Sequence, residues 1–167
     1  MAQNELIGFE NLERVLLEYG KEVRNLYQLN LIHNDRIASG NLLNSVEFDL
    51  EVNGQMFNVC LDWGDVDYWK YIEDGRNPGK FPPTNKILEW IRIKPVIPRP
   101  DSRGKLPTPQ QLAFLIGRKI ANEGYEGTHD IKNANDTIFS RYEPKIIAAL
   151  AQDMESYLQK IVIEVGL

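Results

Sequence analysis

The amino-acid sequence predicts an α+β fold with a long N-terminal helix, an antiparallel β-hairpin or small sheet, and several further helices that include a long C-terminal one. Three observations lead to this prediction: apolar residues recur every three or four positions over residues 9–32, two alternating segments flank an Asn-Gly pair, and a second run of helical spacing closes the chain. The chain has 167 residues, which fits a single domain over residues 1–167.

The N-terminal helix is predicted by one apolar stripe, which also has apolar neighbours beside it. The stripe consists of Phe9, Leu12, Leu16, Tyr19, Val23 and Leu26. Val15, Leu17 and Leu29 lie off this stripe, so the helix is expected to pack on more than one neighbour. The surfaces that it packs on either include another subunit or belong only to the chain's own sheet.

The hairpin is predicted from SVEFDLEVNGQMFNVCLDW, residues 45–63. A two-residue type I′ turn at Asn53-Gly54 is the expected connection, because both central positions of that turn need a positive φ. The register that follows pairs apolar residues on one face, while the other face is mostly polar. The apolar pairs are Leu50 with Phe57, Phe48 with Val59, and Val46 with Leu61.

The stretch YWKYIEDGRNPGKFPP, residues 68–83, is predicted to be a short aromatic helix that ends at Gly75 and continues into a proline-set corner. A helix over Thr84–Ile93 follows, and then a proline-rich basic loop at about residues 94–107.

Two more helices are predicted after this loop. Thr108 and Gln111 form a capping box for the first, which Gly124 ends. After a polar connector the last helix is expected from about Ser140, with Glu143 closing its cap. Its apolar stripe is Ile147, Leu150, Met154, Tyr157, Leu158, Ile161 and Val165.

The composition is that of a soluble globular protein, with 43% hydrophobic and 26% charged residues. Its apolar runs fall short of the roughly 20 residues that a membrane span needs. The acidic, amphipathic start does not resemble a signal peptide, so we expect a cytoplasmic protein without a membrane partner. Cys60 is the only cysteine, which excludes an internal disulfide and a multi-cysteine metal site, and we expect it in the apolar core.

The net charge of −5 is unevenly distributed. Residues 80–105 contain seven basic and two acidic groups, a net charge of +5, and the rest of the chain contains 12 basic and 22 acidic residues, a net charge of −10. This asymmetry favours docking to an oppositely charged surface, either a second copy or nucleic acid, although an ordinary solvated face gives the same pattern.

The sequence offers no convincing reaction chemistry. GRNPGK, residues 75–80, has three residues between its glycines where a phosphate-binding loop needs four, and phenylalanine and prolines follow its lysine. Glu73 and Asp74 are neighbours on a helix and point about 100° apart, so they do not converge on one reacting atom. We therefore predict a protein that is not an enzyme and has no metal, cofactor or small-molecule substrate.

The composition of residues 68–83 fits a protein–protein interface better than a reaction site, although a corner buried in the core would have a similar composition. The corner supplies aromatic area and the loop supplies positive charge. The candidate interface residues are Tyr68, Trp69, Tyr71, Glu73, Arg76, Lys80, Arg99, Arg103 and Lys105.

Several segments together resemble a protein family of tailed bacteriophages. Its members are head-tail joining or tail-completion proteins, and they include the gene-10-like minor tail components. SGNLLNS, residues 39–45, resembles the family's T-G-x-L-x-x-S element, with Ser39 in place of its threonine. Tyr68, Tyr71, Ile72, Glu73 and Gly75 resemble its Y-x-x-Y-[VI]-E-x-G stretch, and RNPGKFPP, ILEWI and FLIGRKIANEGYEG resemble the segments that follow it. The resemblance spans about residues 8–163 and rests on the order of the elements; the basic loop over residues 94–106 departs from the family pattern.

The resemblance implies a structural virion protein that forms a ring of six or twelve copies in the phage neck. It implies portal-side connector and tail proteins as partners, genome DNA passing through the lumen, and a location in the virion after assembly in the host cytoplasm. The alternative is a nucleic-acid-associated protein that binds DNA through residues 80–105, with Trp90 available for stacking. A third reading is a hydrolase that uses Glu73 or Asp74 as an acid or base.

Overall fold

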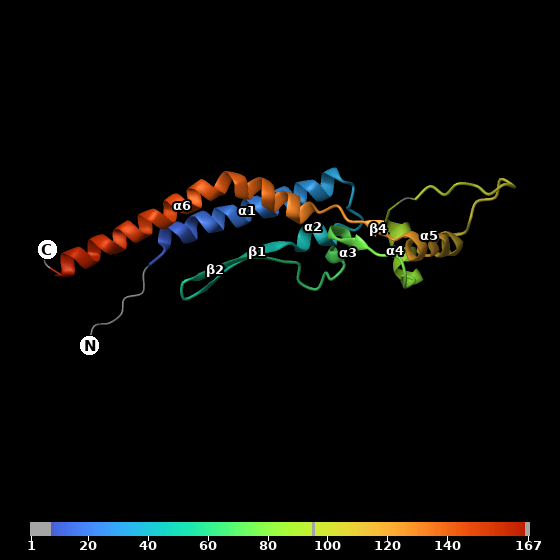
Figure 1. The fold of residues 1–167 in the computed structure, drawn as a ribbon. Helices are drawn as coiled ribbons and strands as arrows, with labels where there is room; N and C mark the ends of the chain where they lie inside the picture. The colour runs from blue at the N-terminus through green and yellow to red at the C-terminus, as the bar shows by residue number, and fades with distance from the viewer. Residues whose placement is uncertain (1–7, 95, 166–167) are drawn as a thin grey trace. The chain divides into compact units, whose positions relative to one another are not determined.

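A computed structural model of the chain describes residues 8–94 and 96–165. The described part contains long first and last helices, shorter helices between them, and two small antiparallel sheets (Figure 1). The α+β class is therefore confirmed. The elements are α1 (Glu10–His33), α2 (Asn41–Ser45), β1 (Glu47–Asn53), β2 (Met56–Asp62), α3 (Trp69–Glu73), β3 (Gly75–Arg76), α4 (Thr84–Ile93), α5 (Pro109–Glu123), β4 (Tyr125–Glu126) and α6 (Asp130–Val165).

The chain divides into two compact units, which are described separately below. Unit 1 consists of Met1–Asn30, Val46–Asp62 and Ile131–Leu167, and unit 2 consists of Leu31–Ser45 and Trp63–Asp130. The expectation that residues 1–167 behave as a single domain stays a prediction.

In unit 1, α1 and α6 lie side by side (Figure 1). The predicted stripe of α1 is confirmed, since Leu12, Tyr19 and Val23 are buried. Tyr19 contacts Tyr142 of α6 with ring centroids 5.8 Å apart, and its hydroxyl donates to Asn135 Oδ1 at 2.5 Å. Aromatic area and a hydrogen bond thus hold the middle of the helix pair together.

The N-terminus of α1 is capped by a residue from α6. Asp153 is only 4% exposed, and its carboxylate accepts the backbone N–H groups of Asn11 at 3.1 Å and of Leu12 at 2.8 Å. It also accepts the Asn11 side-chain amide at 2.7 Å. These bonds satisfy N–H groups that have no partner within the first turn of a helix, and the negative charge lies at the positive end of the helix dipole.

The β1–β2 hairpin forms, but its predicted register is wrong by two residues. Asn53 belongs to the strand and pairs with Met56, so the turn residues are Gly54 and Gln55. Gly54 has a φ of +64°, at the first central position, where a type II′ turn requires glycine. A shift of two residues keeps every side chain on its predicted face, because strands alternate with a period of two. The observed apolar pairs are Phe48 with Leu61, Leu50 with Val59, and Val52 with Phe57.

The apolar face of the hairpin is half-buried and contacts α1. A Cβ atom on Gly20 would overlap the Phe48 ring, so α1 uses a glycine where the hairpin comes closest. Phe9 and Phe57 meet edge to face with centroids 5.6 Å apart.

The prediction that Cys60 lies in the apolar core is wrong. Cys60 is exposed on the polar face of the hairpin, opposite Asp49.

The C-terminal helix begins ten residues before the predicted start at Ser140. α6 runs from Asp130, so part of the predicted polar connector is helical, and the cap predicted at Ser140 does not form. Ala134 and Ile138 are buried, and helical continuation is what places both on one face with Tyr142. The hydroxyl of Ser140 instead donates backwards to the Thr137 carbonyl at 2.8 Å, a bond that a continuous helix accommodates.

In unit 2, the predicted helices α4 and α5 are confirmed. α5 has the predicted capping box: Thr108 Oγ1 accepts from the Gln111 N–H at 3.3 Å, and Gln111 Oε1 accepts from the Thr108 N–H at 2.9 Å. Gly117 of α5 leaves room for the ring of Phe81 and for Ile87 of α4, since a Cβ atom there would meet both.

A junction of β3 and β4 joins two segments that are about 50 residues apart, and the sequence did not predict it. Gly75 pairs with Glu126, and a Cβ atom on Gly75 would overlap the backbone of Tyr125. Gly127 lies so close to the backbone of Glu73 that it also has no room for a side chain. Glycines therefore allow the two segments to approach backbone to backbone.

Candidate interface surfaces

The aromatic corner after β2 has an anchored and an exposed part. Trp69 stacks on Trp63 with ring centroids 4.1 Å apart, so it is half-buried within unit 2. Tyr68 and Tyr71 are exposed, and the guanidinium of Arg76 lies 5.6 Å from the centre of the Tyr71 ring. The corner therefore presents two tyrosines and a cation on a base fixed by tryptophan stacking.

Glu73 differs from the other candidate interface residues because it lies inside unit 2, with 9% exposure. Its carbonyl accepts the N–H of His129 at 3.2 Å, next to the glycine junction. Asp74 is exposed, so the two adjacent carboxylates occupy different surroundings. The expectation that they do not act as a pair stays a prediction.

The proline-set corner is held by hydrogen bonds to two backbone carbonyls. Arg76 Nη2 donates to the Lys80 carbonyl at 2.8 Å, and the Gly79 N–H donates to the Ala121 carbonyl at 2.7 Å. The second bond ties the corner to α5. The Lys80 side chain remains exposed at the start of the basic segment.

The basic loop after α4 is anchored at its base and closed at its tip. Lys94 pairs with Asp35 at 2.7 Å and also donates to the carbonyl of that residue. At the tip, Asp101 Oδ1 accepts the N–H groups of Arg103 and Lys105, each at 2.9 Å. Asp101 thus organises the tip of the loop through backbone hydrogen bonds.

Three cations of this loop, Arg99, Arg103 and Lys105, are exposed. Within the described residues, none of them has a carboxylate partner. The loop also carries Ile97, which is 91% exposed. It therefore presents positive charge and apolar area together.

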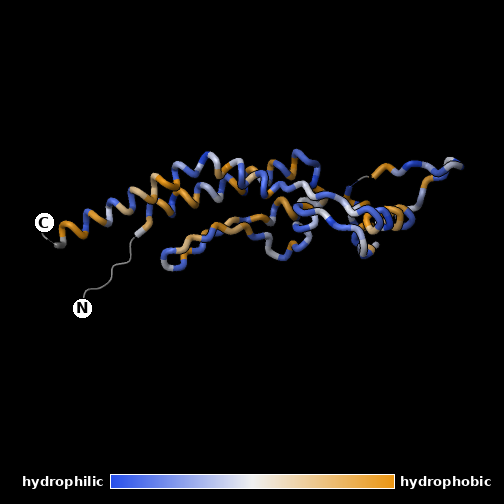
Figure 2. The backbone as a smooth tube through the Cα atoms, viewed as in Figure 1, coloured by the Kyte–Doolittle hydropathy of each residue, from blue (hydrophilic) through white to orange (hydrophobic). Residues whose placement is uncertain are grey.

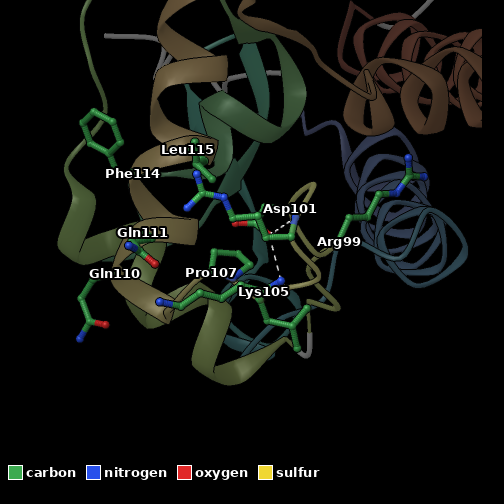
Figure 3. A pocket seen from close by; sticks show the side chains of 10 residues that line it. Arg99, Asp101, Lys105, Pro107, Gln110, Gln111, Phe114 and Leu115 are labelled. Atoms are coloured by element: carbon green, nitrogen blue, oxygen red, sulfur yellow. Dashed lines mark hydrogen bonds between the residues drawn. The ribbon is translucent and has the colours of Figure 1, made fainter.

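An open groove of about 820 Å³ lies between this loop and α5, and we call it the α5 groove (Figure 3). Arg99, Arg103 and Lys105 contribute its positive charge. Exposed apolar side chains of the loop and of α5, Leu106, Phe114 and Leu115, add apolar lining. The three cations were among the predicted interface residues, whereas the apolar lining was not, because the exposure of Phe114 and Leu115 is set by how α5 packs.

A second surface lies in unit 1, on the C-terminal half of α6. The apolar stripe predicted for this helix is largely exposed: Ile147 is 61% and Leu158 is 56% exposed. The face of α6 that packs against α1 is instead marked by Tyr142, Ala149 and Asp153. We call the exposed stripe the α6 ridge and define it by Ile147, Leu150, Met154, Leu158 and Ile161. Figure 2 shows apolar residues recurring along α6 to its C-terminal end.

The geometry of α6 explains how one helix carries two apolar faces. At about 100° per residue, the ridge is centred about 120° around the helix axis from the face that packs on α1. Residues 147 and 158, and residues 150 and 161, are separated by 11 positions. An 11-residue repeat has about 3.67 residues per turn, so the ridge runs nearly straight along the helix.

Among residues 8–94 and 96–165, no cluster of histidine, cysteine and carboxylate side chains is arranged to hold a metal ion. In the same part of the chain, no helix is both long enough and apolar enough to cross a membrane.

No protein-family model, curated protein or solved structure matches the chain.

Proposed function

We propose that the chain is a structural protein of a tailed bacteriophage, which forms a ring of six or twelve copies in the neck and joins portal-side connector proteins to the tail. It acts through the shape and chemistry of its surfaces, without catalysing a reaction. The phage assignment comes from the resemblance of its motifs.

One structural observation carries the proposal: three of the segments that resemble the family fold into one connected piece of unit 2. YIEDGR contributes β3, and NEGYEG contributes β4, which pairs with it through the glycine junction. RNPGKFPP is tied to α5 through Gly79. Segments that are separate in the sequence thus form a single architectural feature, as expected if they are parts of one inherited motif.

The surfaces of the chain are also consistent with a ring. A closed ring is built from heterologous contacts, so each copy needs two different surfaces that complement each other. The α6 ridge in unit 1 and the α5 groove in unit 2 are different in shape and charge. Unit 1 has 7 basic and 14 acidic residues, a net charge of −7, and unit 2 has 12 basic and 10 acidic residues, a net charge of +2.

The composition of purified phage particles tests this function. The proposal predicts that mass spectrometry of particles made from a genome carrying this gene finds the chain in a constant ratio to the portal protein. Its absence from particles that contain portal and tail proteins would refute the proposal.

A DNA-binding role remains the second candidate, because Arg99, Arg103 and Lys105 are exposed and have no ion-pair partner in the described residues. Binding through these residues would weaken steeply with salt, since each neutralised phosphate releases counterions. Reversing their charges, with Arg99→Glu, Arg103→Glu and Lys105→Glu, separates the two roles. Unchanged DNA affinity together with lost assembly assigns the loop to protein contacts, and the opposite result assigns it to DNA.

A further inference from the structure

Two surfaces of this chain lack a partner within their own units, and their chemistry is complementary. The α6 ridge is exposed and apolar, whereas the α5 groove is open, partly apolar and positively charged. We propose that the α6 ridge of one copy docks in the α5 groove of the next copy. This inference rests on the proposed ring and identifies the contact that builds it.

The apolar part of the contact follows from exposure. Leu158 on the ridge and Phe114 at the groove are both more than half exposed, at 56% and 52%. An amphipathic helix that lies in an apolar groove is a recurring mode of recognition, with anchor residues at helical spacing. Leu150, Met154, Leu158 and Ile161 supply such spacing along one face, so burial of both surfaces removes apolar area from water.

The charged part of the contact favours pairing of the ridge with the groove. Glu143 is at the N-terminal end of the ridge, and Glu155 is on its flank; both are exposed and have no ion-pair partner in the described residues. The groove offers Arg99, Arg103 and Lys105, which lack such partners too. Opposite charges at the rim of an interface favour correct docking and suppress wrong partners.

A symmetric contact of ridge with ridge is disfavoured by the same charges. It would bring together two copies of unit 1, each with a net charge of −7. Contact between the ridge and the groove brings unit 1 to the most basic segment of the chain instead. It also uses a different surface on each copy, which is the condition for closing a ring.

Cysteine cross-linking between differently tagged copies tests the contact. Both copies carry Cys60→Ser, because Cys60 is exposed and would form links of its own. One copy then carries Leu158→Cys and the other carries Leu115→Cys; both positions are exposed, so neither change removes a fully buried side chain. The matched control replaces Leu158→Cys with Gln159→Cys, which points about 100° away on the same helix.

The proposal predicts a severalfold higher yield of the mixed dimer for the pair at 115 and 158 than for the pair at 115 and 159. It also predicts that this excess falls as salt increases, because the rim contact is electrostatic. Equal yields for the two pairs, or a predominant link between two copies of Leu158→Cys, would overturn the proposal.

The mass and electron-microscopic images of the Cys60→Ser protein without further cysteines test the ring separately. If the Cys60→Ser protein forms a closed ring but the cysteine variants give no link between positions 115 and 158, this contact is refuted and the neck function still stands. The link in an assembly that never closes supports the contact and counts against the ring.

Discussion

The Oδ2 atom of Asp153 in α6 accepts the backbone N–H of Leu12 in the first turn of α1 at 2.8 Å. The two residues are 141 positions apart, so this bond joins the two ends of the described chain within unit 1. A buried carboxylate thus serves as the N-terminal cap of a helix to which it does not belong.

Asp153→Ala is predicted to lower the free energy of unfolding by about 1–3 kcal/mol, because backbone N–H groups of α1 lose their acceptor. Urea denaturation followed by circular dichroism measures the change. Glu155→Ala is the matched control, since Glu155 is exposed on the same helix and its loss should change stability by less than about 0.5 kcal/mol. Equal effects of the two substitutions would contradict the capping role.

Gly127→Ala is predicted to destabilise the chain by at least about 2 kcal/mol, because the new Cβ atom would overlap the Glu73 backbone and force β3 and β4 apart. Gly8→Ala is the control, as a Cβ atom there meets nothing within 4 Å. Thermal unfolding of both variants measures the difference. A Gly127→Ala protein with the stability of the unsubstituted chain would mean that the junction is not as close as described.

Alkaline pH is predicted to destabilise unit 1 through Tyr19. Burial first, and the nearby Asp136 carboxylate second, raise the pKa of the Tyr19 phenol above 10.0. A raised pKa in the folded state gives stability that is fully present below the pKa of the unfolded chain, about 10, and is lost as pH rises through the folded value. The urea midpoint should therefore fall above about pH 10, and Tyr19→Phe should reduce that fall.

Tyr19→Phe also removes the bond to Asn135, which should cost about 0.5–1.5 kcal/mol at neutral pH. Tyr68→Phe serves as the control because Tyr68 is exposed in unit 2. If both variants showed the same dependence of the urea midpoint on alkaline pH, Tyr19 would not be its source.

Asp101→Ala is predicted to loosen the tip of the basic loop without changing global stability. The amide groups of Arg103 and Lys105 lose their shared acceptor, so their hydrogen exchange should accelerate. The unfolding free energy should change by less than about 0.5 kcal/mol, because the loop is exposed. Ser102→Ala provides the comparison within the same turn. Unchanged exchange at both amides would show that Asp101 does not hold the tip.

Leu158→Lys is predicted to weaken assembly while leaving the fold of each copy intact. Leu158 is exposed, so its replacement should change unfolding of the isolated copy by less than about 0.5 kcal/mol. Docking of the ridge would instead bury the new cation against the apolar lining of a groove that already carries Arg99, Arg103 and Lys105, which is unfavourable. Sedimentation of the variant beside Gln159→Lys measures the difference; equal loss of assembly in both would not fit a contact through the ridge.

Local signals in the sequence predicted much of the fold. The bounds of α4 and the capping box of α5 depend on neighbouring residues in the sequence. The prolines on either side of Thr84–Ile93 were sufficient to locate α4, and Thr108 with Gln111 was sufficient to locate α5. The hairpin face was also predicted, but its register was wrong. Asn53-Gly54 is compatible with two placements of the turn, and both keep the same side chains on the apolar face.

Features that depend on distant parts of the chain were not predicted. The pairing of Gly75 with Glu126 needs two segments to meet in space, and neither segment alone has the length of an ordinary strand. The burial of Asp153 follows from its position beside the N-terminus of α1, a contact that no local pattern reveals. For α6, hydrophobicity indicated the larger apolar stripe, whereas packing on α1 uses Tyr142 and Ala149.

For the candidate interface, the sequence predicted the charge of the basic loop and the aromatic corner. It did not separate the exposed Tyr68 and Tyr71 from the half-buried Trp69 and the buried Glu73, because exposure depends on the Trp63 stack and the glycine junction.

The most direct test of the neck function is an electron-microscopic reconstruction of the head-tail junction in phage particles made from a genome that carries this gene. The neck function predicts a ring of six or twelve copies of the chain between the portal and the tail. Density for this chain elsewhere in the particle, or a fully assigned neck that does not contain it, would refute that function.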